Sequence, residues 1–282
     1  MDNRKVWFVT GASKGLGLTL VKKLLENNYR VAATSRTIGA LIQKIGQPSD
    51  VFLPLEMNLT DNENVKRAIE SCVHHFRGID VVVNNAGFGL IGTLEELSEA
   101  EVKANFDVNV FGSLNVIRHA APFLRQQRSG YIVNIASIGG YSGRYPGFGI
   151  YCSSKFAVAG FSEGLAAEMM DFGVHVSVVY PGYFRTDFLS NGSIQTAARP
   201  IAAYVSARKI EHAHLHEIDG QQPNDPERAA EILINISELP HPPVHLFLGK
   251  DAYEVASHKI ELIQNTMAEY AQIATSTTMI PA

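Results

Sequence analysis

Tyr151 and Lys155 are four positions apart, in a stretch where apolar residues recur at helical spacing. On a helix, this separation places the phenol and the ammonium group on one face. A nearby ammonium group favours the phenolate, so the pair predicts a tyrosine pKa below its ordinary value of about 10. A tyrosine tuned in this way can protonate a carbonyl oxygen or take a proton from an alcohol. Alone, however, Tyr-x-x-x-Lys is common and is more typical of a surface pair.

A second motif, Thr-Gly-Ala-Ser-Lys-Gly-Leu-Gly at 10–17, follows an apolar run at 6–10 and precedes a helical stretch at 16–28. Glycines permit a tight turn and a close approach of the backbone to phosphate, and the helix directs its free N–H groups at a pyrophosphate. The Walker pattern is absent, because no Gly-Lys-Ser/Thr follows. A plain strand–helix turn is the alternative, but the place of the motif after the first strand favours nucleotide binding.

The charged residues near this loop indicate whether it would bind NAD(H) or NADP(H). About 20 residues beyond the loop, Asp or Glu marks NAD, whereas Arg accommodates the 2′-phosphate of NADP. That position falls in Thr34–Thr37, where Arg36 is the charged residue, and no acid occurs between Glu26 and Asp50. Lys14 adds a second cation inside the loop. The sequence therefore predicts NADP(H) in preference to NAD(H).

Further polar residues follow apolar runs. Asn84-Asn85-Ala86-Gly87 ends the run at 79–85, Ser137 ends the run at 131–137, and Asn109 lies between these runs. An open α/β sheet places its ligand crevice at the carboxyl ends of its strands. Each residue also has a structural interpretation, as a turn, a local cap or a helix-bending polar residue.

Seven β-rich apolar runs alternate with helical segments, at 6–10, 29–35, 51–57, 79–85, 131–137, 174–180 and 244–249. Strands that are apolar along their whole length are buried on both faces, as in parallel sheets covered by helices. We expect an α/β fold: a Rossmann-type doubly wound sheet of seven mostly parallel strands, with helices on both faces, in a single domain over 1–282. Helices are expected at 98–127, kinked at Pro122, and at 151–172. A weakly patterned segment at 187–224 predicts a mobile substrate flap with a short helix.

Composition narrows the class of protein. The 282 residues are 46% apolar and 18% charged, which excludes a disordered chain. The net charge of −4 gives no sign of a basic surface that would bind nucleic acid or an anionic membrane. Two cysteines cannot form a disulfide framework and indicate a reducing compartment. Apolar stretches are too short for a signal peptide or a membrane span. We expect a soluble cytoplasmic protein.

Two further features could indicate a metal site and a cysteine nucleophile, but we expect neither. His212, His214 and His216 alternate, but on a helix only the first and last share a face, and no Cys or carboxylate completes a metal site. We therefore predict no metal and interpret these as solvated histidines. Cys152 beside Tyr151 points about 100° away on a helix, which favours a small buried filler over a nucleophile.

The motifs at 10–17 and 84–87, together with Asn109, Ser137, Tyr151-x-x-x-Lys155 and Pro181-Gly182, resemble in order and spacing the compact branch of the short-chain dehydrogenase/reductase family. The resemblance covers residues 5 to about 190 and is nearest to hydroxysteroid and retinol dehydrogenase-like carbonyl reductases. Two departures are visible. Asn58-Leu59-Thr60 stands where the family usually has Asp, and the interval from Ser137 to Tyr151 is about one residue longer than expected.

The resemblance implies roles for the catalytic residues. Tyr151 would be the general acid or base, and Lys155 would lower its pKa and bind the nicotinamide ribose. Ser137 would polarise the substrate carbonyl, and Asn109 would hold a water molecule in a proton relay. Residues expected along the cofactor are Gly11, Ser13, Lys14, Gly15, Leu16, Gly17, Arg36, Asn58, Leu59, Asn85, Ala86, Gly87, Tyr151, Lys155, Pro181, Gly182 and Thr186.

Aromatic residues gather near the expected rim, at Phe88, Tyr141, Tyr145, Phe148, Tyr183, Phe184 and Phe188. They predict a roomy apolar pocket for an aryl, alkyl or steroid-like ketone, with loop packing as the alternative. Substrate contacts are expected from Ser137, Tyr145, Tyr183 and Phe188.

These observations predict an NADPH-dependent oxidoreductase that reduces a small ketone or aldehyde to an alcohol, reversibly. One alternative is a catalytically silent protein of the same fold that senses or binds NADP(H), and another is a related isomerase or lyase. The resemblance also implies a homodimer or homotetramer paired through the helices at 98–127 and 151–172.

Overall fold

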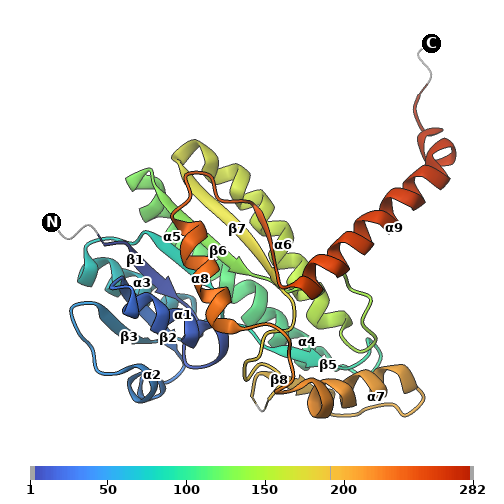
Figure 1. Cartoon of the computed structure of the whole chain (residues 1–282), viewed down its shortest axis with the longest axis horizontal. Coiled ribbons are helices and arrows are strands. Elements are labelled where there is room, and N and C mark those ends of the chain that lie inside the picture. Colours follow the sequence, from blue (N-terminus) through green and yellow to red (C-terminus); the bar gives the residue numbers. More distant parts are fainter. Residues whose placement is uncertain (1–3, 191, 280–282) are drawn as a thin grey trace.

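A seven-stranded sheet forms the centre of the computed structural model, which describes residues 4–190 and 192–279 (Figure 1). Its strand order is β3-β2-β1-β4-β6-β7-β9, and every pair is parallel. The strands are β1 (Val6–Val9), β2 (Arg30–Ser35), β3 (Phe52–Glu56), β4 (Val81–Asn84), β6 (Gly130–Ile135), β7 (Val174–Pro181) and β9 (His245–Leu248). The predicted doubly wound α/β fold is confirmed.

Helices cover both faces of this sheet. One face carries α1 (Gly15–Glu26), α2 (Ile38–Ile45) and α8 (Pro226–Ser237), and the other carries α3 (Asn62–Phe76), α5 (Ser113–Gln127) and α6 (Gly149–Met169). The remaining helices are α4 (Glu99–Phe106), α7 (Val205–His212) and α9 (Lys250–Thr275). Local sequence sets several helix starts: Asp61 caps α3, and Asp225 caps α8, where Pro226 occupies the first turn.

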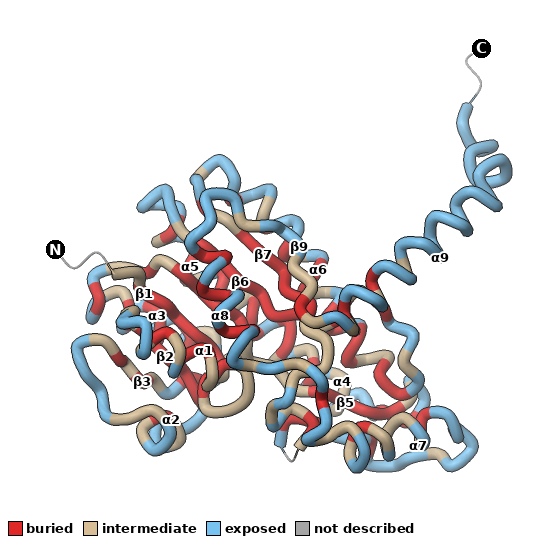
Figure 2. Tube along the Cα trace, viewed as in Figure 1, coloured by how far each residue is buried: buried red, intermediate tan, exposed pale blue. Residues whose placement is uncertain are grey.

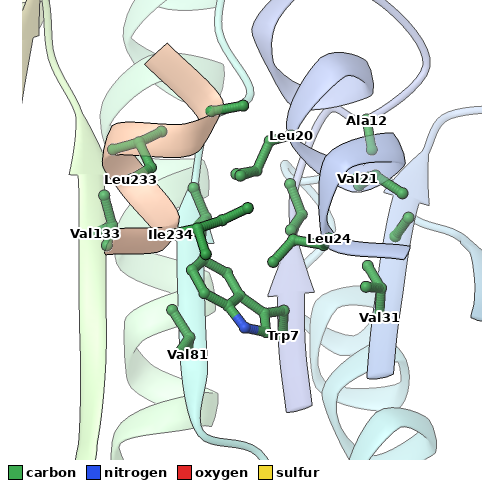
Figure 3. Close-up of a cluster of buried hydrophobic side chains, with 14 of the residues drawn as sticks. Trp7, Ala12, Leu20, Val21, Leu24, Val31, Val81, Val133, Leu233 and Ile234 are labelled. Carbon is green, nitrogen blue, oxygen red and sulfur yellow. The ribbon is translucent and has the colours of Figure 1, made fainter. Parts of the chain in front are cut away.

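Two apolar cores result, one on each face of the sheet. The central strands are accordingly buried along most of their length (Figure 2). In the core under α1 and α8, the fully buried Trp7 of β1 lies between side chains such as Leu24 and Ile234 (Figure 3). The alternating inward residues of β1 thus hold both helices against the sheet, and α1 in turn carries the glycine loop at its N-terminus.

The segment expected as one long helix at 98–127 differs from that prediction. Residues 107–112 form a π-helical turn between α4 and α5, and Pro122 lies inside α5 without ending it. A π-turn inserts one residue into the helical ladder and rotates the side chains that follow, a feature often found at functional sites. Asn109 lies in this turn.

A second, two-stranded parallel sheet was not predicted. It pairs β5 (Gly89–Ile91), just after β4, with β8 (Ile194–Thr196), in the segment expected to be a flap. That segment also carries α7 and a π-helical turn at 213–218. Its Arg208 makes an ion pair of 2.9 Å with the buried carboxylate of Glu96. The flap is therefore tied to the body at several points, and its mobility stays a prediction.

The single-domain prediction over 1–282 also stays a prediction, and it includes residues 1–3, 191 and 280–282, which lie outside the described residues. Across the described part of the chain, no helix has both the length and the apolar character needed to span a bilayer.

Candidate active site

A cavity of about 370 Å³ opens at the carboxyl ends of the central strands, between the glycine loop and the flap. Of the predicted catalytic and cofactor residues, all but two line it: Gly11, Ser13, Lys14, Gly15, Leu16, Arg36, Asn58, Leu59, Asn85, Ala86, Gly87, Ser137, Tyr151, Lys155, Pro181, Gly182 and Thr186. The predicted substrate residues Tyr145, Tyr183 and Phe188 line it as well. Gly17 and Asn109 are buried outside the lining and support residues that form it.

The end of β4 braces the glycine loop. The Thr10 hydroxyl accepts hydrogen bonds from the backbone N–H groups of Asn85 (3.0 Å) and Ala86 (3.1 Å). The side-chain amide of Asn85 donates back to the Thr10 carbonyl at 2.9 Å. Gly11 and Gly15 adopt positive φ angles of 67° and 57°, which favour glycine. The loop is therefore held in a turn whose backbone faces the cavity.

Replacing Gly17 with alanine is expected to destabilise the fold and weaken dinucleotide binding. A Cβ atom at this position would lie 2.4 Å from Asn85 Nδ2 and 2.7 Å from the Gly11 carbonyl oxygen, so the loop must shift. We expect a loss of about 1–3 kcal/mol in the free energy of unfolding, measured by urea denaturation. Gly164→Ala on α6 is the matched control, because its Cβ meets nothing within 4 Å. That control should be neutral or stabilising, and equal losses in both variants would contradict the steric argument.

Cations gather at the outer end of the cavity. Lys14 and Arg36 both line it, and burial, followed by the charge of Arg36 and opposed by Asp187, lowers the pKa of Lys14. Lys44 of α2 adds a weaker repulsion to Lys14. Repelling cations held close together suit an anionic ligand that lies between them. The side-chain oxygen of Asn58 accepts hydrogen bonds from the N–H (3.2 Å) and hydroxyl (3.0 Å) of Thr60, so this oxygen is already engaged locally.

Tyr151 and Lys155 of α6 line the cavity together with Ser137, which follows β6. Tyr151 is 7% and Lys155 is 4% exposed, and Tyr151 makes a side-chain hydrogen bond with Ser137. The Lys155 ammonium donates to the Ile135 carbonyl at 2.9 Å. The prediction of a lowered tyrosine pKa is wrong for this arrangement: burial raises the pKa of Tyr151, and the hydrogen bond from Ser137 opposes that shift only partly. The ammonium group, directed at a backbone carbonyl, is not among the causes.

Burial also lowers the pKa of Lys155, from 10.5 to about 8. Between these two pH values the unfolded chain keeps a lysine proton that the folded chain has released, so this group makes stability rise with pH. Below pH 8 the folded chain bears the full free-energy cost of burying the charged Lys155 ammonium group. Above pH 10.5 it bears none of this cost, because the amine is neutral in both states. Relative to Lys155→Met, the wild-type protein should therefore gain about 3 kcal/mol of unfolding free energy across this window.

Urea denaturation of both proteins at intervals from pH 7 to 10.5 measures this gain. The lost hydrogen bond to Ile135 adds an offset that does not change with pH, and the other titrating groups cancel in the difference. A difference between the two proteins that stays flat from pH 8 to 10.5 would contradict the shift.

Asn109 supports the cavity wall from its π-turn. Its side chain exchanges hydrogen bonds of 3.0 Å with both the N–H and the carbonyl of Phe88, and it donates to the Ser154 hydroxyl at 3.1 Å. A Cβ at Gly87 would lie 2.9 Å from Asn109 Oδ1 and 3.4 Å from Lys155 Nζ. Asn109 is thus joined to the loop after β4 and to α6, directly behind Lys155.

The flap closes the other side with residues that the sequence did not single out for binding. The lining includes Leu189, Ser193, Gln195, His214 and Gln222. The interpretation of His214 as solvated is wrong: it is buried, its Nε2 lies 2.9 Å from the Tyr183 hydroxyl, and its Nδ1 lies 2.7 Å from the Ile210 carbonyl. The π-turn at 213–218 brings it inward. His212 and His216 are exposed, with ring centroids 4.9 Å apart.

The remaining aromatic and sulfur groups divide between the lining and the core. Tyr141 lies outside the lining and packs against Tyr180 and Phe247. The other aromatic residues expected at the rim line the cavity: Phe88, Tyr145, Phe148, Tyr183, Phe184 and Phe188. Cys152 is buried, and burial raises the pKa of its thiol to about 11, as suits a filler more than a nucleophile.

No cluster of three or more metal-ligating side chains occurs among the described residues.

Asp251, at the start of α9, was also missed. Its carboxylate accepts from the Tyr183 N–H at 2.7 Å and from the Asn224 side chain at 2.8 Å, while Asn224 also donates to the Tyr183 carbonyl at 2.9 Å. These contacts fasten the loop after β7 to two later segments. A Cβ at Gly182 would lie 2.2 Å from the same carboxylate, so the residue before Tyr183 must be small.

The family model for short chain dehydrogenases matches residues 5–196. The chain belongs to the short-chain dehydrogenase family. This family of oxidoreductases includes an oxidoreductase, BOA17, of Botryotinia fuckeliana, which is 34% identical over 96% of this chain and 98% of its own length. Human 17-beta-hydroxysteroid dehydrogenase type 1 is 31% identical over 86% of this chain and 77% of its own.

Solved short-chain dehydrogenase structures share the fold. One from Streptomyces avermitilis has a TM-score of 0.90 and 30% identity, and the match covers 98% of this chain and all of that one. Another, from Burkholderia cenocepacia in complex with NADP, has a TM-score of 0.72 and 25% identity, covering 95% of this chain and 98% of that one. The architecture around the cavity is therefore that of dinucleotide-binding relatives.

Proposed function

We propose that this short-chain dehydrogenase is an NADP(H)-dependent oxidoreductase that reduces a ketone or aldehyde to an alcohol, reversibly. One observation carries the proposal: the Tyr151 hydroxyl, bonded to Ser137 and followed on the same helix by Lys155, lies inside a cavity that runs from the glycine loop to an aromatic flap. A proton donor, a carbonyl-binding hydroxyl and a dinucleotide cradle therefore share one enclosed space.

Tyr151 would protonate the developing alkoxide. Because burial raises its pKa, the phenol keeps its proton through the physiological range and is available as an acid. Ser137, already hydrogen-bonded to that phenol, would hold the carbonyl oxygen beside it. The hydroxyl pair thus fixes the position of the oxygen before the proton moves, which lowers the entropic part of the barrier.

Lys155 and Asn109 would replenish the proton. The Lys155 ammonium gives up its proton near pH 8, lies close to Gly87, and has Asn109 behind it. Asn109 holds this wall through Phe88 and Ser154, and the water-holding role that the family resemblance implies for it stays a proposal.

The cofactor residues fit a dinucleotide with an extra phosphate. The glycine loop offers its backbone to the pyrophosphate, and Lys14 and Arg36 offer two cations to the 2′-phosphate. The solved relative that holds NADP supports this preference. NADPH, when bound, would supply the hydride for the carbonyl carbon, and Pro181, Gly182 and Thr186, which also line the cavity, would hold its nicotinamide end.

The substrate would be a small molecule that is mainly apolar around its carbonyl group. Phe88, Tyr145, Phe148, Phe188 and Leu189 enclose the space beside Tyr151. The ring centroids of Tyr151 and Phe188 lie 6.1 Å apart, so an aryl or alkyl group could pack against Phe188 while its carbonyl meets the phenol.

We also propose a cytoplasmic location, in keeping with two buried free cysteines, and a homodimer or homotetramer.

The test is the loss of NADPH absorbance over a panel of aromatic, aliphatic and steroid ketones, with NADH in parallel. Turnover that is at least about tenfold better with NADPH, which is 1.4 kcal/mol of discrimination, supports the proposal. Equal or better turnover with NADH would overturn the proposed preference for NADP(H) but would leave the proposed oxidoreductase activity standing. Tight NADPH binding without turnover of any ketone or of the matching alcohols would favour a sensing protein, and conversion without net cofactor oxidation would favour an isomerase or lyase.

A further inference from the structure

Helix α9 extends from the body of the protein, and only its base is packed (Figure 1). Ala252 and Ala256 are buried against Ile138 of the turn after β6. One turn later, the Lys259 ammonium donates to the Tyr141 carbonyl and lies 5.0 Å from the centre of that ring. Beyond this anchor, residues 260–275 are all exposed (Figure 2).

An exposed helix of this kind needs a partner. Residues 260–275 would extend about 24 Å at 1.5 Å per residue. Isolated helices of this length are marginal in water, and helices in proteins owe most of their stability to packing of an apolar face. Several large apolar side chains are nevertheless open to solvent on this segment: Ile260 (44% exposed), Ile263 (43%), Met267 (68%) and Tyr270 (50%).

The spacing of the apolar residues indicates what kind of partner fits. Seven apolar residues fall alternately three and four positions apart along the helix, at Tyr253, Ala256, Ile260, Ile263, Met267, Tyr270 and Ala274, while the exposed Leu262 lies outside this repeat. This repeat, with apolar residues at the first and fourth of every seven positions, is the seam of a two-helix coiled coil. Ala256 is buried against the body, so we call the five that lie beyond it and are open to solvent, Ile260, Ile263, Met267, Tyr270 and Ala274, the α9 seam. Polar residues Asn265 and Gln272 lie on the opposite side of the helix, and Ile273 borders the seam.

The charge of the helix argues against a lipid surface. Its cations are Lys250 and Lys259, whereas its carboxylates are Asp251, Glu254, Glu261 and Glu269. Helices that lie in membrane interfaces are rich in Lys and Arg on their polar face, and anionic lipids would repel this acidic one. Apart from Leu262 and Ile273, the large apolar residues at 260–275 follow the seven-residue repeat, and such a repeat suits another helix better than a bilayer.

We propose that the partner is α9 of a second copy of this chain, so that two seams pack together in a symmetric dimer. Homo-oligomers with twofold symmetry bring the same surface of each subunit together, and the α9 seam offers one self-complementary apolar surface. This interface is separate from the pairing of α5 and α6 that the family resemblance implies. The seam contains no residue that lines the cavity.

Sedimentation equilibrium of the full chain tests the proposal with two charge-matched double variants. Ile263→Glu/Met267→Glu places two carboxylates in the seam, whereas Asn265→Glu/Gln272→Glu places two on the opposite side. At the same micromolar concentration, wild type and the control variant should have the same mass, at least twice the 30.8 kDa of one chain. The seam variant should have half that mass. Far-UV circular dichroism and NADPH binding confirm folding, and Ile263→Asn/Met267→Gln repeats the test with a milder change.

Three outcomes would overturn the proposal. The first is a wild-type protein with the mass of one chain throughout the concentration range. The second is a seam variant that keeps the mass of the wild type. The third is a wild-type protein that floats with phosphatidylcholine–phosphatidylserine vesicles through the seam, since the occupant would then be lipid. None of these results bears on turnover, so the proposed function is tested separately.

Discussion

Replacing Tyr151 with phenylalanine is expected to lower kcat for NADPH-dependent ketone reduction by about 10²–10⁴-fold, the usual contribution of a positioned general acid. The variant keeps the ring that packs against Phe148 and Phe188 and loses only the hydroxyl that bonds to Ser137. The Kd for NADPH should therefore stay unchanged, as measured by fluorescence titration. Steady-state kinetics with the best ketone of the panel gives kcat.

Tyr145→Phe is the matched control for this prediction. Tyr145 lines the same cavity and also loses a hydroxyl, but it lies in the loop before α6 and has no hydroxyl partner comparable to Ser137 in its proposed role. We expect its effect to fall mainly on KM. Turnover close to wild type in Tyr151→Phe, or an equal fall of kcat in Tyr145→Phe, would contradict the assignment of Tyr151 as the acid.

The second large effect is expected at the cation pair. In Lys14→Ala/Arg36→Ala, kcat/KM with NADPH should fall by about 10²-fold or more, because charge-assisted hydrogen bonds to phosphate contribute about 1.5–3 kcal/mol each. The value with NADH should change little, since NADH has no 2′-phosphate for these residues to bind. Initial rates with each cofactor at a fixed ketone concentration measure both values.

Lys22→Ala/Lys66→Ala provides the control, since it removes two exposed cations that do not line the cavity. If NADPH use depended only on the overall charge of the protein, this control would lose as much as the cavity pair. An equal loss with NADPH and NADH in the cavity variant would instead place the two cations on the shared pyrophosphate and would contradict the predicted preference.

Much of the fold could be predicted because its strands are apolar along their whole length and its helices have local start signals. Asp225, for example, caps α8, and Pro226 occupies its first turn. The π-turn around Asn109 has no comparable local signal, since it depends on contacts with Phe88 and Ser154. The strands β5 and β8 are three residues each and pair only when the flap folds back over the body, so a local pattern does not mark them.

The candidate site divides in the same way. The half that we propose for the dinucleotide lies in one βα turn and at strand ends, where short motifs are informative, and the cavity brings those residues together. The flap half depends on distant contacts, such as that of Asp251 with Tyr183, 68 positions apart. The direction of the Tyr151 pKa shift also depended on burial. Charge spacing along a helix could not show that Lys155 would turn to the Ile135 carbonyl.

The strand order of the sheet bears on how the chain is made. β1 lies in the interior with β2 and then β3 added on one side, while β4, β6, β7 and β9 follow outward on the other in the order of the chain. Each strand that leaves the ribosome can therefore join an open edge of a growing sheet, and no strand has to be inserted between two that are already paired. Since chains emerge N-terminus first, at about 5–20 residues per second, the glycine loop and its supporting strands can assemble well before β9 completes the sheet.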